Sequence, residues 1–297
     1  MFKIIPIGFE SLGVRSMATY IQTDDSLIVI DPSASLAPYR YSLPPHEIEW
    51  KRLHDIIDRI SDILKDADAF IVTHYHYDHH DPAKLIDPNT YKGKIALVKD
   101  PRSFINISQR IRASRFINKV LKDRVKTIEI IDDRNFKIGD VVLKFSKPVP
   151  HGPNDKLGYV VMVAVLHEDG RLVFTSDVEG PLNDYEVDFI VSNDPNIVII
   201  DGPPTYLLPN NYPEECLDIA INLNAKILCS VGNLNYLILD HHLLRDLNYS
   251  KFYDEVLRVC TKSKARLMTA AEFVGDEPQL LEARRRELYE RFQYGMS

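Results

Sequence analysis

Four histidines within seven residues constrain this chain more than any other feature of its sequence. They are His74, His76, His79 and His80, and they directly follow the β-branched apolar run at residues 70–72. Without a bound ligand, such a cluster would concentrate costly polar groups beside the end of a strand. We therefore interpret the cluster as a metal site rather than as a chance group of structural histidines.

The spacing within the cluster indicates how the ligands are divided. On an extended segment, residues two apart point to the same side, so His74 and His76 can offer two imidazoles to one ion. If the chain then bends into a helix, Asp78 and His79 approach from another direction and reach a second ion. Imidazole and carboxylate together suit zinc, manganese, iron or nickel, and zinc is the commonest outcome.

Short apolar runs alternate with helical patterns along the whole chain, with no clear linker between them. β-branched runs bounded by Asp, Gly, Pro or Asn are typical of strands covered on both faces. We predict one domain over residues 1–297. The expected strands are 27–30, 70–72, 95–98, 128–131, 141–145, 159–165, 172–174, 197–200, 227–229 and 237–239, and the expected helices are 53–64, 104–121, 214–223 and 276–292.

Acidic or imidazole residues repeatedly follow the predicted strands. They are Asp31, His151, Asp177, Asp201 and the pair His241 and His242. In open α/β sheets, sites gather outside the carboxyl ends of the strands. We therefore expect these side chains to converge on the histidine cluster.

Charge and cysteine content bear on partners and compartment. The formal net charge of −7 gives no global attraction to nucleic acid or anionic lipid. The three cysteines, Cys216, Cys229 and Cys260, form no Cys-x-x-Cys pair, so we expect reduced, buried thiols in a reducing cytosol. Neither a signal peptide nor a membrane-spanning apolar run is apparent, which predicts a cytoplasmic protein with no membrane association.

Two further segments admit a structural and a functional interpretation. Residues 110–126 carry seven basic side chains and one acidic one, which we interpret as a solvated helix face. The alternative is a guide for an anionic substrate such as a phosphodiester. Residues 34–45 are rich in Pro and Tyr, which predicts a surface loop. We interpret His46, Trp50 and His54, beside this loop, as residues of ordinary packing; the alternative is that they form a lid over the site.

The spacing His-x-His-x-Asp-His at His74, His76, Asp78 and His79 resembles the central motif of the metallo-β-lactamase fold superfamily. Further matches over most of the chain are the apolar hairpin ending at Asp31, His151 in Pro-His-Gly, Asp177 in Phe-Thr-Ser-Asp, and His241 after Leu-Ile-Leu-Asp. The layout is similar to an uncharacterised archaeal branch of that superfamily. The resemblance implies an α/β (α+β) fold, a four-layer αββα sandwich of two mixed β-sheets with outer helices.

The resemblance also implies a ligand set. His74, His76 and His151 would hold one metal, Asp78, His79 and His241 the other, and Asp177 would bridge the two. Asp31 would orient the ligand loop, and His242 is the alternative to His241 as the last ligand. The flavin-dependent diiron branch would be expected to have Glu at position 76, so His76 argues against that branch. The absence of cysteine near these motifs argues against a thiolate ligand.

The implied activity is that of a metal-dependent hydrolase. Two divalent cations, zinc by preference and manganese or iron otherwise, would supply a metal-bound hydroxide that attacks an ester- or phosphodiester-type bond. Asp78 would be the catalytic residue that orients or deprotonates the nucleophile, and His80, His242 or water would protonate the leaving group. The substrate would be a small or anionic molecule. The alternatives are a nuclease or phosphodiesterase acting on nucleic acid, and a non-catalytic metal-binding scaffold; the oligomeric state is left open.

Overall fold

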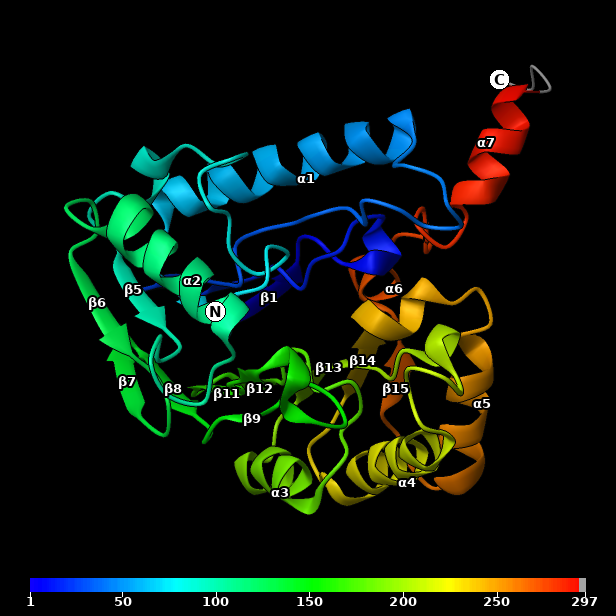
Figure 1. Cartoon of the computed structure of the whole chain (residues 1–297). Coiled ribbons are helices and arrows are strands. Elements are labelled where there is room, and N and C mark those ends of the chain that lie inside the picture. The colour runs from blue at the N-terminus through cyan, green and yellow to red at the C-terminus, as the bar shows by residue number, and fades with distance from the viewer. Residues whose placement is uncertain (294–297) are drawn as a thin grey trace.

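Two mixed β-sheets packed face to face, with helices on their outer faces, form the computed structural model, which describes residues 1–293 (Figure 1). This confirms the four-layer αββα sandwich expected from the sequence. The expectation of one domain over residues 1–297 stays a prediction, and its last four residues lie outside the described part of the chain.

The first sheet has the strand order β1-β2-β3-β4-β5-β6. Its first two pairings are antiparallel and the next three are parallel. The hairpin between β2 and β3 turns at Asp24 and Asp25. The strands are β1 (Lys3–Pro6), β2 (Thr19–Gln22), β3 (Leu27–Ile30), β4 (Ala69–Val72), β5 (Ile95–Val98) and β6 (Thr127–Ile130).

The second sheet has the order β15-β14-β13-β12-β11-β8-β7. Its pairings from β7 to β12 are antiparallel and those from β12 to β15 are parallel. A separate two-stranded ribbon pairs β9 (Val149–Pro150) with β10 (Tyr159–Val160). The seven strands are β7 (Asn135–Ile138), β8 (Val141–Phe145), β11 (Val163–His167), β12 (Gly170–Phe174), β13 (Ile197–Asp201), β14 (Tyr236–Asp240) and β15 (Arg266–Met268).

Alternation along the strands divides the core into three layers. Ile28 and Ile30 of β3 face the second sheet in the central cluster, whereas Val29 joins the cluster beneath the helices of the first sheet. Successive side chains of a strand point to opposite faces, so both sheet faces are buried. Figure 1 shows α1 (Glu47–Asp66) and α2 (Ile107–Arg115) on one side, and α3 (Asp184–Asn193), α4 (Glu214–Ser230) and α5 (Ser250–Val259) on the other.

The helices correct several sequence predictions. Residues 227–229 are not a strand but the last turn of α4, in which Ile227 and Leu228 are buried; a short apolar run does not distinguish a strand from a buried helix segment. The segment 104–121 becomes α2 followed by the π-helical turn η3 (Phe116–Leu121). The predicted helix at 276–292 begins only at α7 (Arg285–Gln293), and α3 and α5 were not predicted. The short α6 (Ala270–Val274) follows β15.

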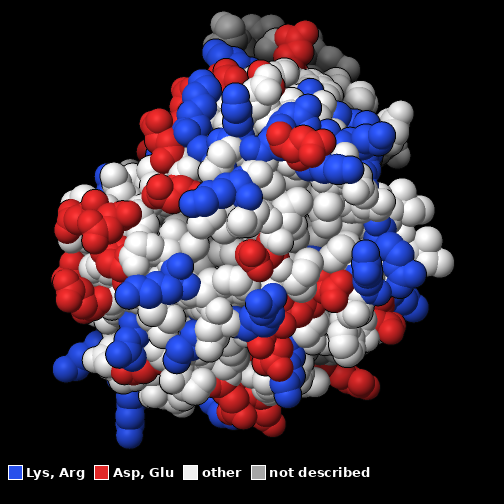
Figure 2. Space-filling view, turned by 90° about the vertical axis from the view of Figure 1, so that its left-hand side faces the viewer, with Lys and Arg blue, Asp and Glu red and all other residues white. Residues whose placement is uncertain are grey.

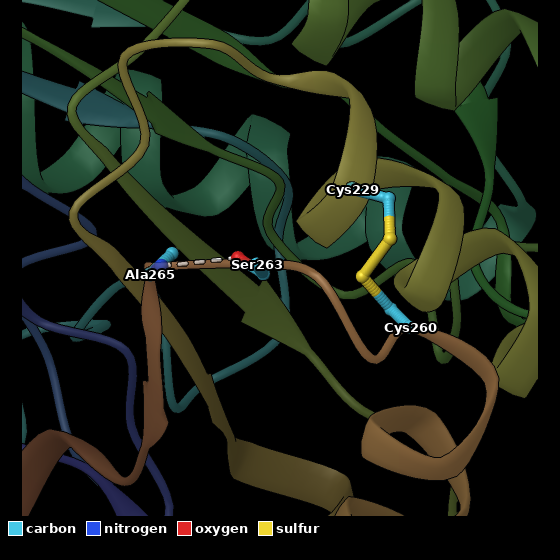
Figure 3. Close-up of a disulfide and its surroundings, with 4 residues drawn as sticks. All are labelled: Cys229, Cys260, Ser263 and Ala265. Atoms are coloured by element: carbon cyan, nitrogen blue, oxygen red, sulfur yellow. Dashed lines mark hydrogen bonds between the residues drawn. A yellow bond between two sulfur atoms is a disulfide. The ribbon is translucent and has the colours of Figure 1, made fainter.

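A disulfide joins Cys229, near the end of α4, to Cys260, directly after α5 (Figure 3). The expectation of three reduced thiols is therefore wrong, and Cys216 is the free cysteine. The two cysteines are 31 residues apart in sequence, and the packing of α4 against α5 brings their Cα atoms to 6.0 Å. Beyond the bridge, the backbone N–H of Ala265 donates to the Ser263 hydroxyl (3.0 Å).

Within residues 1–293, no helix combines the length and apolar character required to cross a bilayer.

Candidate metal centre

The loop after β4 carries the histidine cluster, and we call residues 73–80 the metal-ligand loop. It leaves the sheet at Thr73 and closes into a turn in which the N–H groups of His79 and His80 donate to the carbonyl of His76. This turn sends the later side chains off in a new direction, as the sequence spacing predicted. The loop therefore contributes ligand atoms to two separate groups.

The first ligand group consists of His74, His76 and His151, and the second of Asp78, His79 and His241. The ligand atoms of the first group and of Asp177 all lie within 4.8 Å of one another. The ligand atoms of the second group also lie within 4.8 Å of one another. His151 follows β9, and His241 opens the 3-10 helix η6 (His241–Arg245) at the end of β14. The ends of separate strands thus supply one site.

Asp177 lies between the two ligand groups. Its Oδ2 atom is 3.4 Å from Nε2 of His74 and 3.1 Å from Nε2 of His151. Its Oδ1 atom is 3.1 Å from Nε2 of His79, and its Oδ2 atom is 3.4 Å from Nε2 of His241. One carboxylate therefore contacts imidazoles of both groups, which is the arrangement that a bridging ligand requires.

Neutral groups support two of the imidazoles of the first ligand group. Nδ1 of His74 is 3.2 Å from the Ser176 hydroxyl and 3.3 Å from that of Thr73. The Gln109 amide of α2 lies 3.4 Å from Nε2 of His76. The exception is His151, whose Nδ1 lies 3.6 Å from a Glu179 oxygen.

Carboxylates support both imidazoles of the second ligand group. Asp31 lies 2.9 Å from Nδ1 of His79, and Glu10 lies 2.7 Å from Nδ1 of His241. Asp31 is itself fixed by the N–H and hydroxyl of Thr73. A carboxylate at one ring nitrogen fixes the tautomer and directs the other nitrogen toward a metal. The second oxygen of Glu10 accepts from the buried Arg245 guanidinium (2.6 Å).

The two groups differ in their protonation. Burial lowers the pKa of His74 to about 4 and holds that of His76 well below its usual value. Burial also opposes a charge on His79, but Asp177 and Asp31 outweigh it and raise its pKa to about 10. Glu10 and Asp177 likewise outweigh burial and raise the pKa of His241.

Several buried ligand atoms have no hydrogen-bond partner within residues 1–293. They are Nε2 of His74, His79 and His151 and both carboxylate oxygens of Asp177. Buried polar atoms are ordinarily paired, and a metal ion held between them is one explanation of an exception. The donors are imidazoles and carboxylates, which suit zinc, manganese or iron. The residues present therefore fit a pair of divalent cations.

The site opens toward solvent on one side. His74, His79 and His241 are fully buried, whereas His76 and Asp78 are only partly buried. A substrate would therefore approach from the His76 and Asp78 side.

Backbone strain is concentrated around the site. Asp31, Ser176, Glu179 and His241 all have φ between 45° and 60° (48°, 57°, 49° and 57°), in the left-handed region that non-glycine residues rarely adopt. Such conformations persist where the surrounding structure holds them, and they cluster at functional sites.

The structure also locates the residues whose roles the sequence left open. His241 is grouped with Asp78 and His79, whereas His242 is grouped with His151 and Glu179 and also with Asp177 and His241. Nδ1 of His242 pairs with Asp201 at 3.0 Å. His80 belongs to neither ligand group: its ring packs on Tyr75, Tyr77 and Phe116, and burial lowers its pKa to about 3.

Sequence analysis missed Glu10, Gln109, Glu179 and Arg245, which contact the ligands. Glu10 lies in the short 3-10 helix η1 (Glu10–Leu12), more than 200 residues from its partner His241. A glutamate or glutamine carries no local signal of such a contact, so only the fold could reveal these residues.

The basic stretch lies along α2 and η3, beside the first ligand group. Figure 2 looks onto this side of the molecule, where Lys and Arg side chains are interspersed with Asp and Glu. The contact of Gln109 with His76 places the start of α2 at the site.

Comparison with known proteins assigns the class. Residues 13–232 match the model of the metallo-beta-lactamase superfamily, so the chain belongs to that superfamily, as the sequence motifs predicted. Its cluster of histidine and aspartate side chains is a potential metal-binding site of that superfamily.

The particular family is UPF0282. A UPF0282 protein of the archaeon Sulfurisphaera tokodaii is 45% identical over 289 residues, covering 97% of this chain and 93% of that protein. A second, from Sulfolobus acidocaldarius, is 46% identical over 290 residues, with the same coverages.

Solved structures share the fold at low sequence identity. The metallo-beta-lactamase fold protein YhfI of Bacillus subtilis has a TM-score of 0.56 and 14% identity, over 90% of this chain and 95% of that one. An isothiocyanate hydrolase from Delia radicum gut bacteria has a TM-score of 0.54 and 16% identity, over 86% and 94%.

Proposed function

We propose that the protein is a metal-dependent hydrolase with a dinuclear centre, zinc being the expected metal, that cleaves an ester- or phosphodiester-type bond. The observation that carries this proposal is the position of Asp177, whose carboxylate contacts imidazoles of both ligand groups. A carboxylate shared in this way has its negative charge balanced if two cations flank it. The membership of the superfamily and the hydrolase among the structural neighbours support the same reaction class.

The residues of the chain have distinct tasks in this proposal. His74, His76 and His151 would hold one cation, and Asp78, His79 and His241 the other, with Asp177 between them. Two such cations lower the pKa of a bound water toward ~7 and stabilise the negative charge that develops on the substrate. Asp31 and Glu10 keep the second-group imidazoles in the tautomer whose Nε2 faces the centre.

Asp78 is the proposed catalytic residue of the protein itself. His79 and His241 outweigh burial and hold its pKa below the ordinary value, so its carboxylate is ionised at neutral pH. It is partly exposed at the open side of the site, where it can accept a hydrogen bond from the attacking water and orient it. Among the proposed proton donors, His242 lies at the site, and His80 is turned away from it.

A nuclease or phosphodiesterase remains the second candidate. The observation in its favour is that α2, which begins the basic stretch, contacts the metal-ligand loop through Gln109. Binding of single-stranded RNA or DNA that falls steeply with added salt would support this candidate. No binding at low salt would eliminate it.

The test of the proposed function combines elemental analysis with a substrate panel. The purified protein should contain two divalent cations and hydrolyse at least one ester, thioester, lactone or phosphodiester. His76→Ala should lose metal and hydrolysis together, while His54→Ala, on the exposed face of α1, should lose neither. Full activity with stoichiometric metal in His76→Ala would refute the assignment. Bound metal with no turnover on any substrate would favour the non-catalytic scaffold.

A further inference from the structure

A second cleft lies beside the metal-ligand loop, outside the ligand groups. Its volume is about 630 Å³, within the range of small-molecule sites. The Pro- and Tyr-rich loop, the start of α1 and the segment after the metal-ligand loop form its walls. The side chains that matter here are Leu36, Tyr39, Trp50, Tyr77, Lys84 and Leu85.

The walls of this cleft expose much apolar surface. The exposed fractions are 72% for Tyr39, 45% for Trp50 and 37% for Leu85. A contiguous patch of exposed aromatic and aliphatic side chains, concave and rimmed by polar residues, is typical of a ligand or partner site. The sequence favoured a surface loop for Tyr39 and ordinary packing for Trp50, whose ring stacks on His54 and is still 45% exposed.

Two cations lie at the Tyr77 ring, and one of them, Lys84, lines the cleft. The Tyr77 ring lies 5.4 Å from Nζ of Lys84 and 4.6 Å from the Arg112 guanidinium carbon. Within residues 1–293, neither cation forms an ion pair with a carboxylate. The Asp81 carboxylate also lines the cleft, but it already accepts the backbone N–H groups of Lys84 (2.8 Å) and Ile86 (3.1 Å).

We propose that this cleft binds a small amphipathic anion. The apolar part of the ligand would lie against Tyr39, Trp50 and Leu85, and its phosphate or carboxylate would pair with Lys84. Charge complementarity selects this ligand, because the exposed apolar wall lies beside Lys84, which has no carboxylate partner within residues 1–293, and Arg112 lies on the same Tyr77 ring. The site is distinct from the metal centre, although Tyr77 stands between the ligands His76 and Asp78 and joins the two.

Trp50 makes the proposal directly measurable, because it is the single tryptophan of the chain. We would record its fluorescence in metal-depleted full-length protein, so that an anion cannot act through a bound cation. The probes are n-octyl phosphate and octanoate, with inorganic phosphate and 1-octanol as the anionic and apolar controls. We expect a saturable blue shift with the two amphipathic anions, none with inorganic phosphate, and at least tenfold weaker binding of octanol.

Matched variants separate the two parts of the ligand. Lys84→Gln should weaken n-octyl phosphate binding at least fivefold and leave octanol unchanged, while Lys92→Gln, an exposed lysine outside the cleft, should change neither. Tyr39→Ala should weaken every ligand that binds. A difference between n-octyl phosphate and octanoate identifies the preferred head group.

Three results would overturn the proposal. They are no saturable change with either amphipathic anion, equal binding in Lys84→Gln, and a Trp50 spectrum that depends on protein concentration together with a dimer abolished by Tyr39→Ala. The last result would assign the cleft to a second copy of the chain. Because binding is measured without metal, failure here leaves the proposed hydrolase activity intact, and failure of that activity leaves this test intact.

Discussion

The two ligand groups face each other across Asp177, yet their surroundings are opposite. In the first group, hydroxyl and amide groups support His74 and His76, and burial keeps both imidazoles neutral. In the second group, Asp31 and Glu10 support His79 and His241 and favour their protonated forms. The pKa values of histidines that contact the same Asp177 carboxylate are therefore shifted in opposite directions.

This difference in protonation indicates how the two groups would take up metal. A cation entering the second group must displace protons from imidazoles that carboxylates hold charged, whereas His74 and His76 of the first group are already neutral. In exchange, the carboxylates around the second group attract a divalent cation more strongly once the protons have left.

Removing the shared carboxylate should have the largest effect. Asp177→Asn takes away the one side chain that contacts both groups, so both ions should be bound more than ~100-fold more weakly, beyond the range of a residue that only supports a ligand. Metal content after dialysis and hydrolysis of the best panel substrate would measure this.

The matched control is Asp140→Asn, which removes the partner of His167 away from the site. Loss of only one ion in Asp177→Asn would show that the carboxylate serves one group and does not bridge.

Stability of the metal-free protein should depend on pH in opposite ways through the two groups. The pKa of His74 falls from 6.5 to about 4 on folding. The free energy of unfolding should therefore fall as pH drops below 6.5, by about 3 kcal/mol in all once the pH is below 4. The pKa of His79 rises to about 10, so its contribution is full below 6.5 and is lost as pH rises toward 10. Denaturant melts from pH 4 to pH 10 would record both.

Single variants isolate each contribution. His74→Gln should reduce the loss of stability on the acidic side and leave the alkaline side unchanged, and His79→Gln should do the reverse; His76 and His241 would still contribute to the two sides. Parallel profiles for both variants would contradict the difference between the groups.

Weakening a supporting carboxylate should have a smaller and selective effect. Glu10→Gln leaves His241 in place but removes the negative charge at Nδ1, so the affinity for one of the two ions should fall about 10–100-fold. Titration with a competing chelator would resolve the two ions. An equal loss at both would mean that Glu10 acts on the fold rather than on the second group.

The smallest effect is expected at Ser176. Ser176→Ala removes a neutral hydroxyl 3.2 Å from Nδ1 of His74, while the Thr73 hydroxyl at 3.3 Å remains. The affinity of the first group should change less than the ~10-fold that marks the lower end for supporting residues. The same chelator titration measures it, and a loss as large as that of Glu10→Gln would erase the distinction between neutral and charged support.

The sequence predicted the fold well where local pattern and tertiary role agree. Strands β3, β4 and β13 are short β-branched runs buried on both faces, and each was expected within a residue or two. Prediction failed where the local signal was ambiguous or absent. Residues 227–229 are apolar and β-compatible, yet they form the last turn of α4, and Cys229 and Cys260 are joined across a separation that no spacing rule indicates.

The motif at residues 74–79 and the carboxylates or imidazoles after several predicted strands indicated side chains that the structure brings together, and the family resemblance supplied their division into two ligand groups. The residue types determine which side chains can bind a metal, and the two-residue period of an extended loop determines which of them point to the same side. Both are local properties of the sequence. The protonation of each imidazole, the open side of the site and the exposed cleft at Trp50 depend on which atoms lie next to which. Those contacts join residues hundreds of positions apart, such as Glu10 and His241, so only the folded chain could decide them.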